Sequence, residues 1–222
     1  MTRIKIHKEG KMILLSMLFI LFALNLFFYL QIPRLPFFIT TIFSAAILCF
    51  FTFFFRNPER TVNIDDSSLI FAPADGEIVV VEPTEESEYF GEKRLQISIF
   101  MSVFNVHAQW YPIAGTVLKT AHHSGRHMMA FLPKSSHENE RSTVIIETES
   151  KTQILVRQVA GALARRIVTY AHAGKKCHLN EQLGFIKFGS RVDMYLPLDA
   201  EVFVEVGEKT IGNETIIARL NE

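Results

Sequence analysis

The stretch Phe185–Pro197, FIKFGSRVDMYLP, decides how the second half of the chain is interpreted. Two apolar, strand-like runs flank the pair Gly189-Ser190, and Gly-Ser is typical of a hairpin turn between two strands. A serine hydroxyl placed behind a flexible glycine carbonyl can also attack it and convert the amide to an ester. The pair is therefore a candidate self-cleavage site, although the two residues by themselves favour a turn.

The rest of the sequence after Arg60 predicts a mainly β domain over residues 61–222. Closely spaced short strands without a long amphipathic helix indicate an all-β sandwich or a barrel-like fold. The segment His122–Arg141, rich in His, Ser and charge, is expected to be a loop with at most one short helical turn. The predicted strands, bounded by Gly, Pro, Asp or Asn, are Leu69–Phe71, Glu77–Val81, Leu95–Met101, Thr116–Ala121, Thr143–Glu147, Gln153–Val159, Ile167–Tyr170, Gly184–Phe188, Val192–Leu196 and Glu201–Val204.

Residues 1–60 predict a membrane hairpin with spans at about 12–32 and 37–55, because each apolar run has the length that crosses a bilayer as a helix. A cleaved secretory signal is disfavoured because a second span follows, and a buried hairpin because charge is nearly absent. Basic residues lie mainly at the outer ends of the two spans and hardly at all between them. This bias places both termini and the β domain on the cytoplasmic face of the cell (inner) membrane.

Composition narrows the partners and the compartment. The 23 basic and 23 acidic residues cancel, which argues against a nucleic-acid partner. Cys49 lies in the second span and Cys177 in the β domain, so no disulfide framework is expected, as in a reducing compartment.

A serine nucleophile needs a base that takes its proton and a third group that orients the base. His107, at the end of an apolar run, is the candidate base, and Asp75, in a tight turn before a strand, is the candidate third group. Taken singly, a structural histidine and a turn-forming aspartate are the commoner explanations.

Several motifs follow one another along the chain: Phe55–Arg60 (FRNPER), Pro73–Gly76 (PADG), Phe104–His107 (FNVH), Asn139–Arg141 (NER), Gly161 with Ala164–Arg166 (ARR), and Phe188–Asp193 (FGSRVD). In this order they resemble the short, membrane-anchored class of phosphatidylserine decarboxylase proenzyme. The similarity extends from the second span to the C-terminus.

The resemblance implies self-cleavage between Gly189 and Ser190 into a β chain, 1–189, and an α chain, 190–222, which stay associated as a heterodimer. The α chain would begin with a pyruvoyl group made from Ser190. The residues matching Asp75 and His107 activate the serine in this family. We expect His107 to take the hydroxyl proton, Asp75 to hold the imidazole ring, and backbone N–H groups to stabilise the oxyanion.

The resemblance also implies the reaction. The pyruvoyl ketone forms a Schiff base with the amine of phosphatidylserine and accepts the electron pair released with CO2, a role otherwise filled by pyridoxal phosphate. His107 is the candidate donor of the returning proton, and phosphatidylethanolamine is released into the membrane. No metal is implied. Arg56 and Arg60 are candidates either for contact with lipid phosphate or for setting the orientation of the spans.

Two departures from the family pattern bear on the substrate. Val103 stands where proline is usual, and Ala108-Gln109-Trp110 replaces Val-Asn-Arg, which removes an arginine next to the histidine. Arg126, Lys134 and Arg141 are candidates to replace it.

Two other functions remain open from the residues. His122, His123 and His127, with Asp75 or His107, would suit a membrane-tethered zinc hydrolase, because His123 and His127 have the i, i+4 spacing of ligands on a helix. Gly125 weakens a helix there. A non-catalytic, membrane-tethered β module is the other alternative.

Overall fold

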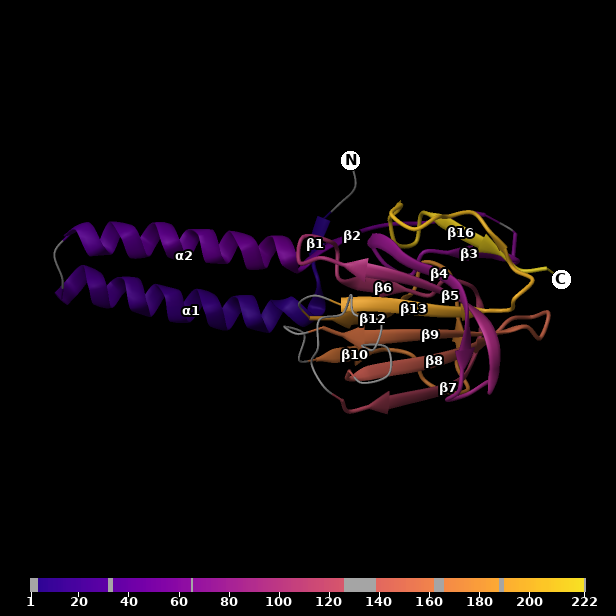
Figure 1. Cartoon of the computed structure of the whole chain (residues 1–222). Coiled ribbons are helices and arrows are strands. Elements are labelled where there is room, and N and C mark those ends of the chain that lie inside the picture. The colour runs from indigo at the N-terminus through magenta and orange to yellow at the C-terminus, as the bar shows by residue number, and fades with distance from the viewer. Residues whose placement is uncertain are drawn as a thin grey trace. The chain divides into compact units, whose positions relative to one another are not determined.

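The structure, a computed structural model, describes residues 4–31, 34–64, 66–125, 139–161, 166–187 and 190–221 (Figure 1). Contacts between Cα atoms divide the chain into two compact units, residues 1–59 and residues 60–222. The first unit is mainly helical and the second is built from strands.

The first unit is a hairpin of two helices with a small sheet formed by the segments before and after it. Helix α1 covers Lys8–Gln31 and α2 covers Arg34–Phe54, while β1 (Ile4–Ile6) pairs antiparallel with β2 (Arg56–Pro58). Both helices are long and apolar enough to cross a membrane. The predicted pair of apolar helices is therefore confirmed.

Three polar residues of the two helices bind one another. Asn25 Nδ2 donates to Ser44 Oγ at 2.8 Å, and Thr41 Oγ1 donates to Asn25 Oδ1 at 2.9 Å. Hydrogen bonds of this kind hold apolar helices together where hydrophobic burial gives little driving force.

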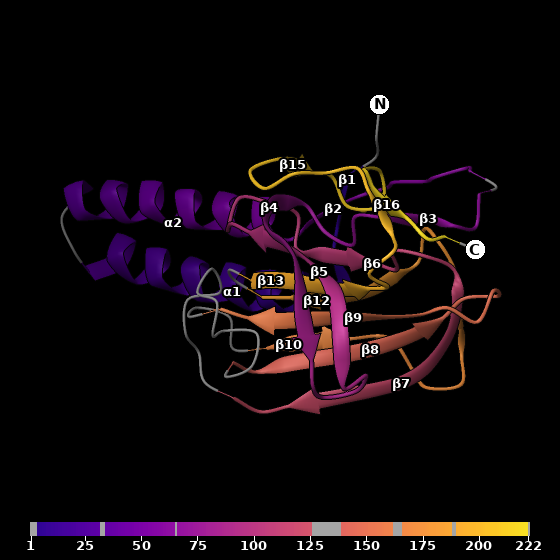
Figure 2. The ribbon, with the colours of Figure 1, turned by 45° about the vertical axis from the view of Figure 1, so that its right-hand side comes forward.

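The second unit consists of three antiparallel sheets (Figures 1 and 2). The large sheet has the order β11-β7-β8-β9-β13-β5-β4-β15, and the two small sheets have the orders β10-β12-β6 and β14-β16-β3. The strands are β3 Leu69–Phe71, β4 Gly76–Glu86, β5 Glu92–Met101, β6 Ala108–Trp110, β7 Gly115–His123, β8 Arg141–Glu147, β9 Gln153–Ala160, β10 Ile167–Thr169, β11 Lys176–Cys177, β12 Gln182–Ile186, β13 Ser190–Leu196, β14 Glu201–Val202, β15 Lys209–Thr210 and β16 Ile216–Arg219.

The expectation of a mainly β domain behind a helical hairpin is confirmed, and the large sheet curls as a half-barrel would (Figure 2). The loop prediction for His122–Arg141 is wrong at its ends. His122 and His123 finish β7 and Arg141 starts β8, because the two strands pair in register there, His123 opposite Arg141. Residues 126–138 of the predicted loop lie outside the described residues.

Strand β13 lies in the middle of the large sheet, between β5 and β9, and is buried on both faces. Its residues alternate between faces. Val192, Met194 and Leu196 join the main hydrophobic core, whereas Tyr195 belongs to a second cluster with Ile145 and Leu155.

The β4–β5 hairpin covers this second cluster. Figure 2 shows β4 and β5 passing across the neighbouring strands of the large sheet, and the hairpin residues Tyr89 and Phe90 pack against the cluster. A fully buried ion pair, Arg157 Nη2 to Glu86 Oε1 at 2.7 Å, fastens the hairpin to β9. The strand that begins at Ser190 is thus enclosed from both sides.

Candidate active site

Ser190 is the first residue of β13, and it does not lie in a two-stranded hairpin. Strand β12, which ends at Ile186, pairs with β10 and β6, whereas β13 pairs with β5 and β9. The chain therefore passes from one sheet to another between Ile186 and Ser190, and the hairpin-turn interpretation is wrong. Phe188 and Gly189 lie outside the described residues.

The Ser190 side chain is fully buried in an environment with a weak acceptor. Its hydroxyl donates to Met101 Sδ at 3.3 Å, and a thioether sulfur binds hydrogen weakly. In the ladders, Ser190 lies opposite Met101 and Ala160. Asn139, from one of the sequence motifs, donates its side-chain amide to the Ala160 carbonyl at 2.7 Å. This hydrogen bond fixes Asn139 to the end of β9, the strand that pairs with β13 at Ser190.

His107 is joined to the segment that leads to Ser190. The Ile186 N–H lies 3.4 Å from the His107 carbonyl, and the His107 ring centroid lies 6.4 Å from that of Phe185. The ring is fully buried, with Nδ1 at 3.0 Å from the Asn105 carbonyl oxygen. Because a carbonyl only accepts, Nδ1 carries the proton of the neutral ring and Nε2 is the basic nitrogen.

Asp75, in the turn between β3 and β4, is held by Arg60 and by the main chain of Gly212. The guanidinium binds both carboxylate oxygens, with Nη2 to Oδ2 at 3.0 Å, and the Gly212 N–H donates to Oδ1 at 2.9 Å. Among the residues that the structure describes, no hydrogen bond joins Asp75 to His107. The imidazole is thus held by the Asn105 carbonyl, where the sequence had suggested Asp75.

Gly76 explains why a glycine follows this aspartate. A Cβ atom at Gly76 would lie 2.2 Å from the Phe100 carbonyl oxygen, so that a larger residue would push β4 away from β5. The Asp-Gly turn can approach β5 closely only without a side chain at this position.

Gln109 is a residue that the sequence marked only as a departure from the family pattern. It is fully buried and donates to the His107 carbonyl at 2.6 Å, while Gln158 Nε2 donates to Gln109 Oε1 at 2.8 Å. Thr169 then donates to Gln158 Oε1 at 2.7 Å. Buried polar chains of this kind fix the groups that they connect.

The position of the missing arginine is occupied by Trp110, whose ring lies 5.0 Å from the guanidinium carbon of Arg60. Arg141, one of the candidate replacements, binds Glu88, and its side chain is 12% exposed. The other two candidates, Arg126 and Lys134, lie outside the described residues.

Arg191 and Asp193, from the last motif, form a buried ion pair. Arg191 Nε donates to Asp193 Oδ1 at 2.7 Å and Nη2 donates to Oδ2 at 3.2 Å. Both residues are almost fully buried on the face of β13 opposite the main core. The pair therefore keeps two charges compensated beside Ser190.

The histidines of the zinc hypothesis do not lie on a helix. His122 and His123 belong to β7, so that the i, i+4 helical argument does not apply to them, and His122 Nε2 lies 3.5 Å from Glu140 Oε1. His127 lies outside the described residues. Within the described ranges, no three His, Cys, Asp or Glu side chains lie close enough together to hold a metal ion.

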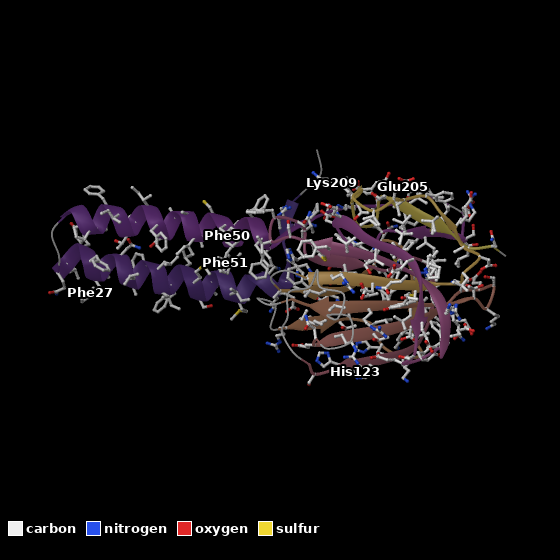
Figure 3. All side chains as sticks on the ribbon, in the orientation of Figure 1. Phe27, Phe50, Phe51, His123, Glu205 and Lys209 are labelled. Atoms are coloured by element: carbon white, nitrogen blue, oxygen red, sulfur yellow. The ribbon has the colours of Figure 1, made fainter. Side chains whose placement is uncertain are left out.

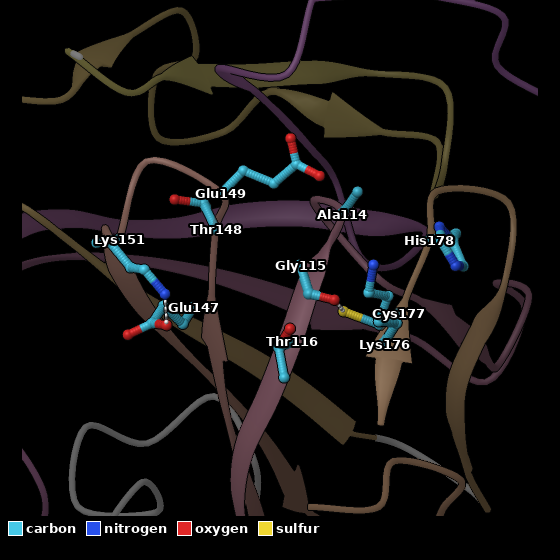
Figure 4. Close-up of a pocket in the computed structure, with 10 residues that line it drawn as sticks. All are labelled: Ala114, Gly115, Thr116, Glu147, Thr148, Glu149, Lys151, Lys176, Cys177 and His178. Carbon is cyan, nitrogen blue, oxygen red and sulfur yellow. Dashed lines mark hydrogen bonds and ion pairs between the residues drawn. The ribbon is translucent and has the colours of Figure 1, made fainter. Parts of the chain in front are cut away.

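The cavities among the described residues of the second unit include two at opposite ends of the ladders of the large sheet. One, of about 240 Å³, is lined by Gly76, Glu77, Phe100, Ser102, Asn105 and Lys209. The other, of about 330 Å³, includes Cys177, Lys176 and Glu147 in its lining (Figure 4). It lies at the end of β7 and β8 where Thr116 pairs with Glu147, far along the ladder from Ser190. Burial raises the pKa of the Cys177 thiol to about 11, so the thiol there is not an activated nucleophile.

The fold and the site define a β-sheet enzyme with an apolar helical hairpin, in which a buried serine begins a central strand and a histidine with a basic Nε2 lies in the adjoining segment. The model of the phosphatidylserine decarboxylase family matches residues 47–218. The chain belongs to this family, and the resemblance noted in the sequence and the prediction of a carboxy-lyase are confirmed.

Three curated relatives illustrate the similarity, and each is a phosphatidylserine decarboxylase proenzyme. The protein of Bacteroides thetaiotaomicron is 52% identical over 221 residues, which cover 99% of this chain and 97% of the relative. That of Parabacteroides distasonis is 52% identical over 219 residues, 98% of this chain and 100% of the relative. That of Porphyromonas gingivalis is 49% identical over 222 residues, 98% of this chain and 100% of the relative.

Proposed function

We propose that the chain is a proenzyme that cleaves itself between Gly189 and Ser190 and then converts phosphatidylserine to phosphatidylethanolamine and CO2. The observation that carries the proposal is the junction at Ser190. A fully buried hydroxyl begins a strand held on both sides, and the preceding segment is hydrogen-bonded to the main chain of His107. Family membership supports the same reaction.

The cleavage step uses the chain's own atoms. His107 Nε2 takes the Ser190 hydroxyl proton, and Oγ attacks the Gly189 carbonyl carbon. The bond from that carbon to the Ser190 nitrogen breaks, the nitrogen takes the proton, and an ester remains. Loss of the Ser190 Cα proton then forms the Cα=Cβ double bond and breaks the Cβ–Oγ bond. Gly189 leaves as a carboxylate, and hydrolysis of the dehydroalanine releases ammonia and gives the pyruvoyl ketone.

The two ladders suit this chemistry because they hold one side of the scissile bond. Strands β5 and β9 fix the main chain from Ser190 to Leu196, whereas strand pairing on the other side ends at Ile186. The acyl group can therefore shift to oxygen while the new N-terminal residue stays in place. The residues present also fit a pyruvoyl group, since the Ser190 position is buried between two strands.

When formed, the pyruvoyl group supplies a carbonyl that takes up the substrate amine and accepts the electron pair released with CO2. The residues of the chain do the rest. Burial at Ser190 keeps water away from the departing carboxylate. His107 returns a proton to the α-carbon of the substrate from Nε2. Asp75 is fixed by Arg60, and its neighbour Gly76 lines the same cavity as Asn105, whose carbonyl holds the His107 ring.

The same proposal covers location and assembly. The helices α1 and α2 anchor residues 1–60 in the cell membrane, and residues 61–222 act on the cytoplasmic face. The β chain, 1–189, and the α chain, 190–222, remain associated after cleavage. The substrate then reaches the site from the membrane in which it resides.

A serine substitution tests the proposal. Ser190→Ala is expected to give one uncleaved polypeptide and no decarboxylation, whereas Ser98→Ala, which removes the hydroxyl of another fully buried serine in the neighbouring strand β5, is expected to be processed. Denaturing gels and intact mass measure processing. In the wild type, a carbonyl-trapping reductant with phosphatidylserine should label the C-terminal fragment. A fully active preparation that consists of one unbroken chain would contradict the proposal.

A further inference from the structure

The cavity of about 240 Å³ is bounded by neighbours of all three candidate site residues. Gly76 follows Asp75. Ser102 follows Met101, whose sulfur accepts from the Ser190 hydroxyl. Asn105 holds the His107 ring through its carbonyl oxygen. A ligand in this cavity would therefore lie next to the turn, the strand end and the loop that together form the site.

The polar groups in the lining carry both signs of charge. Lys209 lies directly opposite Glu77 in the ladder between β15 and β4, and in the described part of the chain no ion pair joins their side chains. Both residues are exposed. Ser102 adds a hydroxyl group. A lysine ammonium binds phosphate as a point charge, and a carboxylate attracts an amine.

We infer that this cavity receives the headgroup of a membrane phospholipid, with Lys209 binding the phosphate and Glu77 attracting the ammonium group. The inference rests on the proposed function, because it assigns residues to the substrate of that reaction. It places the phosphate of phosphatidylserine at β15 and directs the serine moiety toward Ser190. In this assignment Lys209 supplies the cation that the family pattern has as an arginine at the position of Trp110.

Three exposed apolar residues lie close in sequence to the lining residues Asn105 and Lys209, and we refer to them as the apolar rim. Phe104, beside Asn105, is 65% exposed, and Val206 and Ile211, on either side of Lys209, are 63% and 47% exposed. Figure 3 shows Lys209 and Glu205 at one edge of the β unit and His123 at another. Exposed apolar side chains around a cation are typical of surfaces that enter the headgroup region of a bilayer.

The connection between α2 and the turn beside this cavity is short in sequence. Arg60 binds Asp75, the neighbour of Gly76, and only five residues separate Arg60 from Phe54 at the end of α2. Six chain steps extend at most about 20 Å, whatever the orientation of the two units. This short connection to an apolar helix favours a membrane phospholipid as the occupant.

Substitution of Lys209 tests the phosphate contact in the full-length enzyme in detergent. We expect Lys209→Gln to raise the KM for phosphatidylserine about tenfold, because a charged hydrogen bond is lost, while Lys209→Arg keeps the KM within about threefold. Processing at Ser190 should be unchanged in both. The matched control is Lys176→Gln, which removes a lysine from the other cavity (Figure 4). Equal KM values in wild type and Lys209→Gln, or an equal rise in the control, would overturn the inference.

A second measurement does not depend on turnover. In the Ser190→Ala background, soluble short-chain phosphatidylserine should raise the thermal unfolding midpoint, and Lys209→Gln should require about tenfold more lipid for the same shift. Inorganic phosphate should give no such shift. If phosphatidylserine binding depends on Lys209 but the wild-type enzyme is never processed, the proposed function is wrong and the headgroup site is supported. If processing and turnover occur but phosphatidylserine binds equally well with and without Lys209, only the headgroup site is wrong.

The apolar rim has its own test. Phe104→Ser should slow decarboxylation of long-chain phosphatidylserine in vesicles at least about threefold more than decarboxylation of soluble short-chain phosphatidylserine, because only the bilayer substrate needs contact with the rim. Equal effects on both substrates would contradict a role in membrane contact.

Discussion

Arg60 shows how one residue is used differently from what its position in the sequence suggests. It follows the second span closely, where a basic residue commonly sets orientation or meets lipid phosphate. In the structure its side chain is 8% exposed and binds Asp75 through both nitrogens of the fork. It also donates to the Gly212 carbonyl at 3.0 Å. Arg60 is thus a positioning residue for the Asp75 turn.

Removal of this guanidinium should slow self-cleavage. We expect Arg60→Gln to reduce the processing rate at least about tenfold, because a small displacement of a site residue slows the reaction strongly. Arg60→Lys should retain only part of the rate, since lysine cannot bind the carboxylate bidentately. Pulse-chase labelling between pH 6 and 8 measures the rate, and thermal unfolding measures stability. The control is Glu214→Gln, which removes the other, half-exposed acidic partner of Arg60. A lower unfolding temperature with an unchanged processing rate would mean that Arg60 is only structural.

The buried amides of Gln109 and Gln158 make a second residue-scale prediction. Gln158→Leu leaves Gln109 Oε1 without its described donor, and Gln109→Leu leaves the His107 carbonyl without its closest one. Each change should destabilise the folded enzyme by about 1–3 kcal/mol. The double substitution should cost less than the sum, because no unsatisfied amide partner remains between them. Additive changes in denaturant unfolding would show that the two residues are not coupled.

At the scale of elements, the sequence was informative where β-branched and aromatic residues are consecutive. Strand β3 agrees with its predicted bounds, and β4, β5 and β7 contain theirs. Strand β6 was missed because its three residues, Ala108–Trp110, include a polar glutamine whose burial depends on Gln158, 49 positions away. Strands β11 and β15 have two residues each, too few for any periodicity.

The candidate site was predicted by residue type but not by contact. The motifs singled out Asp75, His107 and Ser190, yet the partners of Asp75 are Arg60 and Gly212, and those interactions are fixed by sheet pairing across the whole domain. The passage from one sheet to another before Ser190 is likewise a matter of pairing, which local composition does not encode. The roles of these three residues stay predictions.

The β4–β5 hairpin predicts a dependence of stability on pH. Burial alone would raise the pKa of Glu86, but the N–H groups of Phe90 and Tyr89 and the Arg157 guanidinium together lower it. A carboxyl with a lowered folded pKa contributes stability that is present above its unfolded pKa and is lost as the pH falls through the folded pKa. The unfolding temperature should therefore decrease as the pH is lowered below about 4.5, which is the ordinary range of a glutamate pKa.

Glu86→Gln provides the comparison for this pH dependence. At pH 7 it should destabilise the enzyme by about 1–3 kcal/mol, because the charged hydrogen bonds of Glu86 are lost while Glu88 remains a carboxylate partner of Arg157 at 2.9 Å. Between pH 6 and pH 3 its unfolding temperature should change less than that of the wild type. Lys151→Gln, which removes an exposed ion pair with Glu147, is the control and should change stability by less than about 1 kcal/mol. Parallel pH curves for wild type and Glu86→Gln would contradict this account.

At the scale of the whole molecule, strands of the segment from Ser190 to the C-terminus pair with strands from the rest of the second unit. Strand β13 pairs with β5 and β9, β15 pairs with β4, and β16 pairs with β3. The turn at Gly212 also reaches the Arg60–Asp75 pair. Cleavage before Ser190 would break one peptide bond and none of these ladders.

The two products of cleavage should therefore remain together. We expect the α chain, the 33 residues from Ser190 to Glu222, to co-migrate with the β chain in non-denaturing detergent and to separate only in denaturant. The reason is that β13 alone is buried on both faces between two strands of the β chain, so that release exposes Val192, Met194 and Leu196 to water. Size exclusion in detergent followed by a denaturing gel measures this. The unfolding temperatures of processed enzyme and Ser190→Ala should agree within a few degrees, and loss of the α chain on dilution would show that the ladders alone do not hold it.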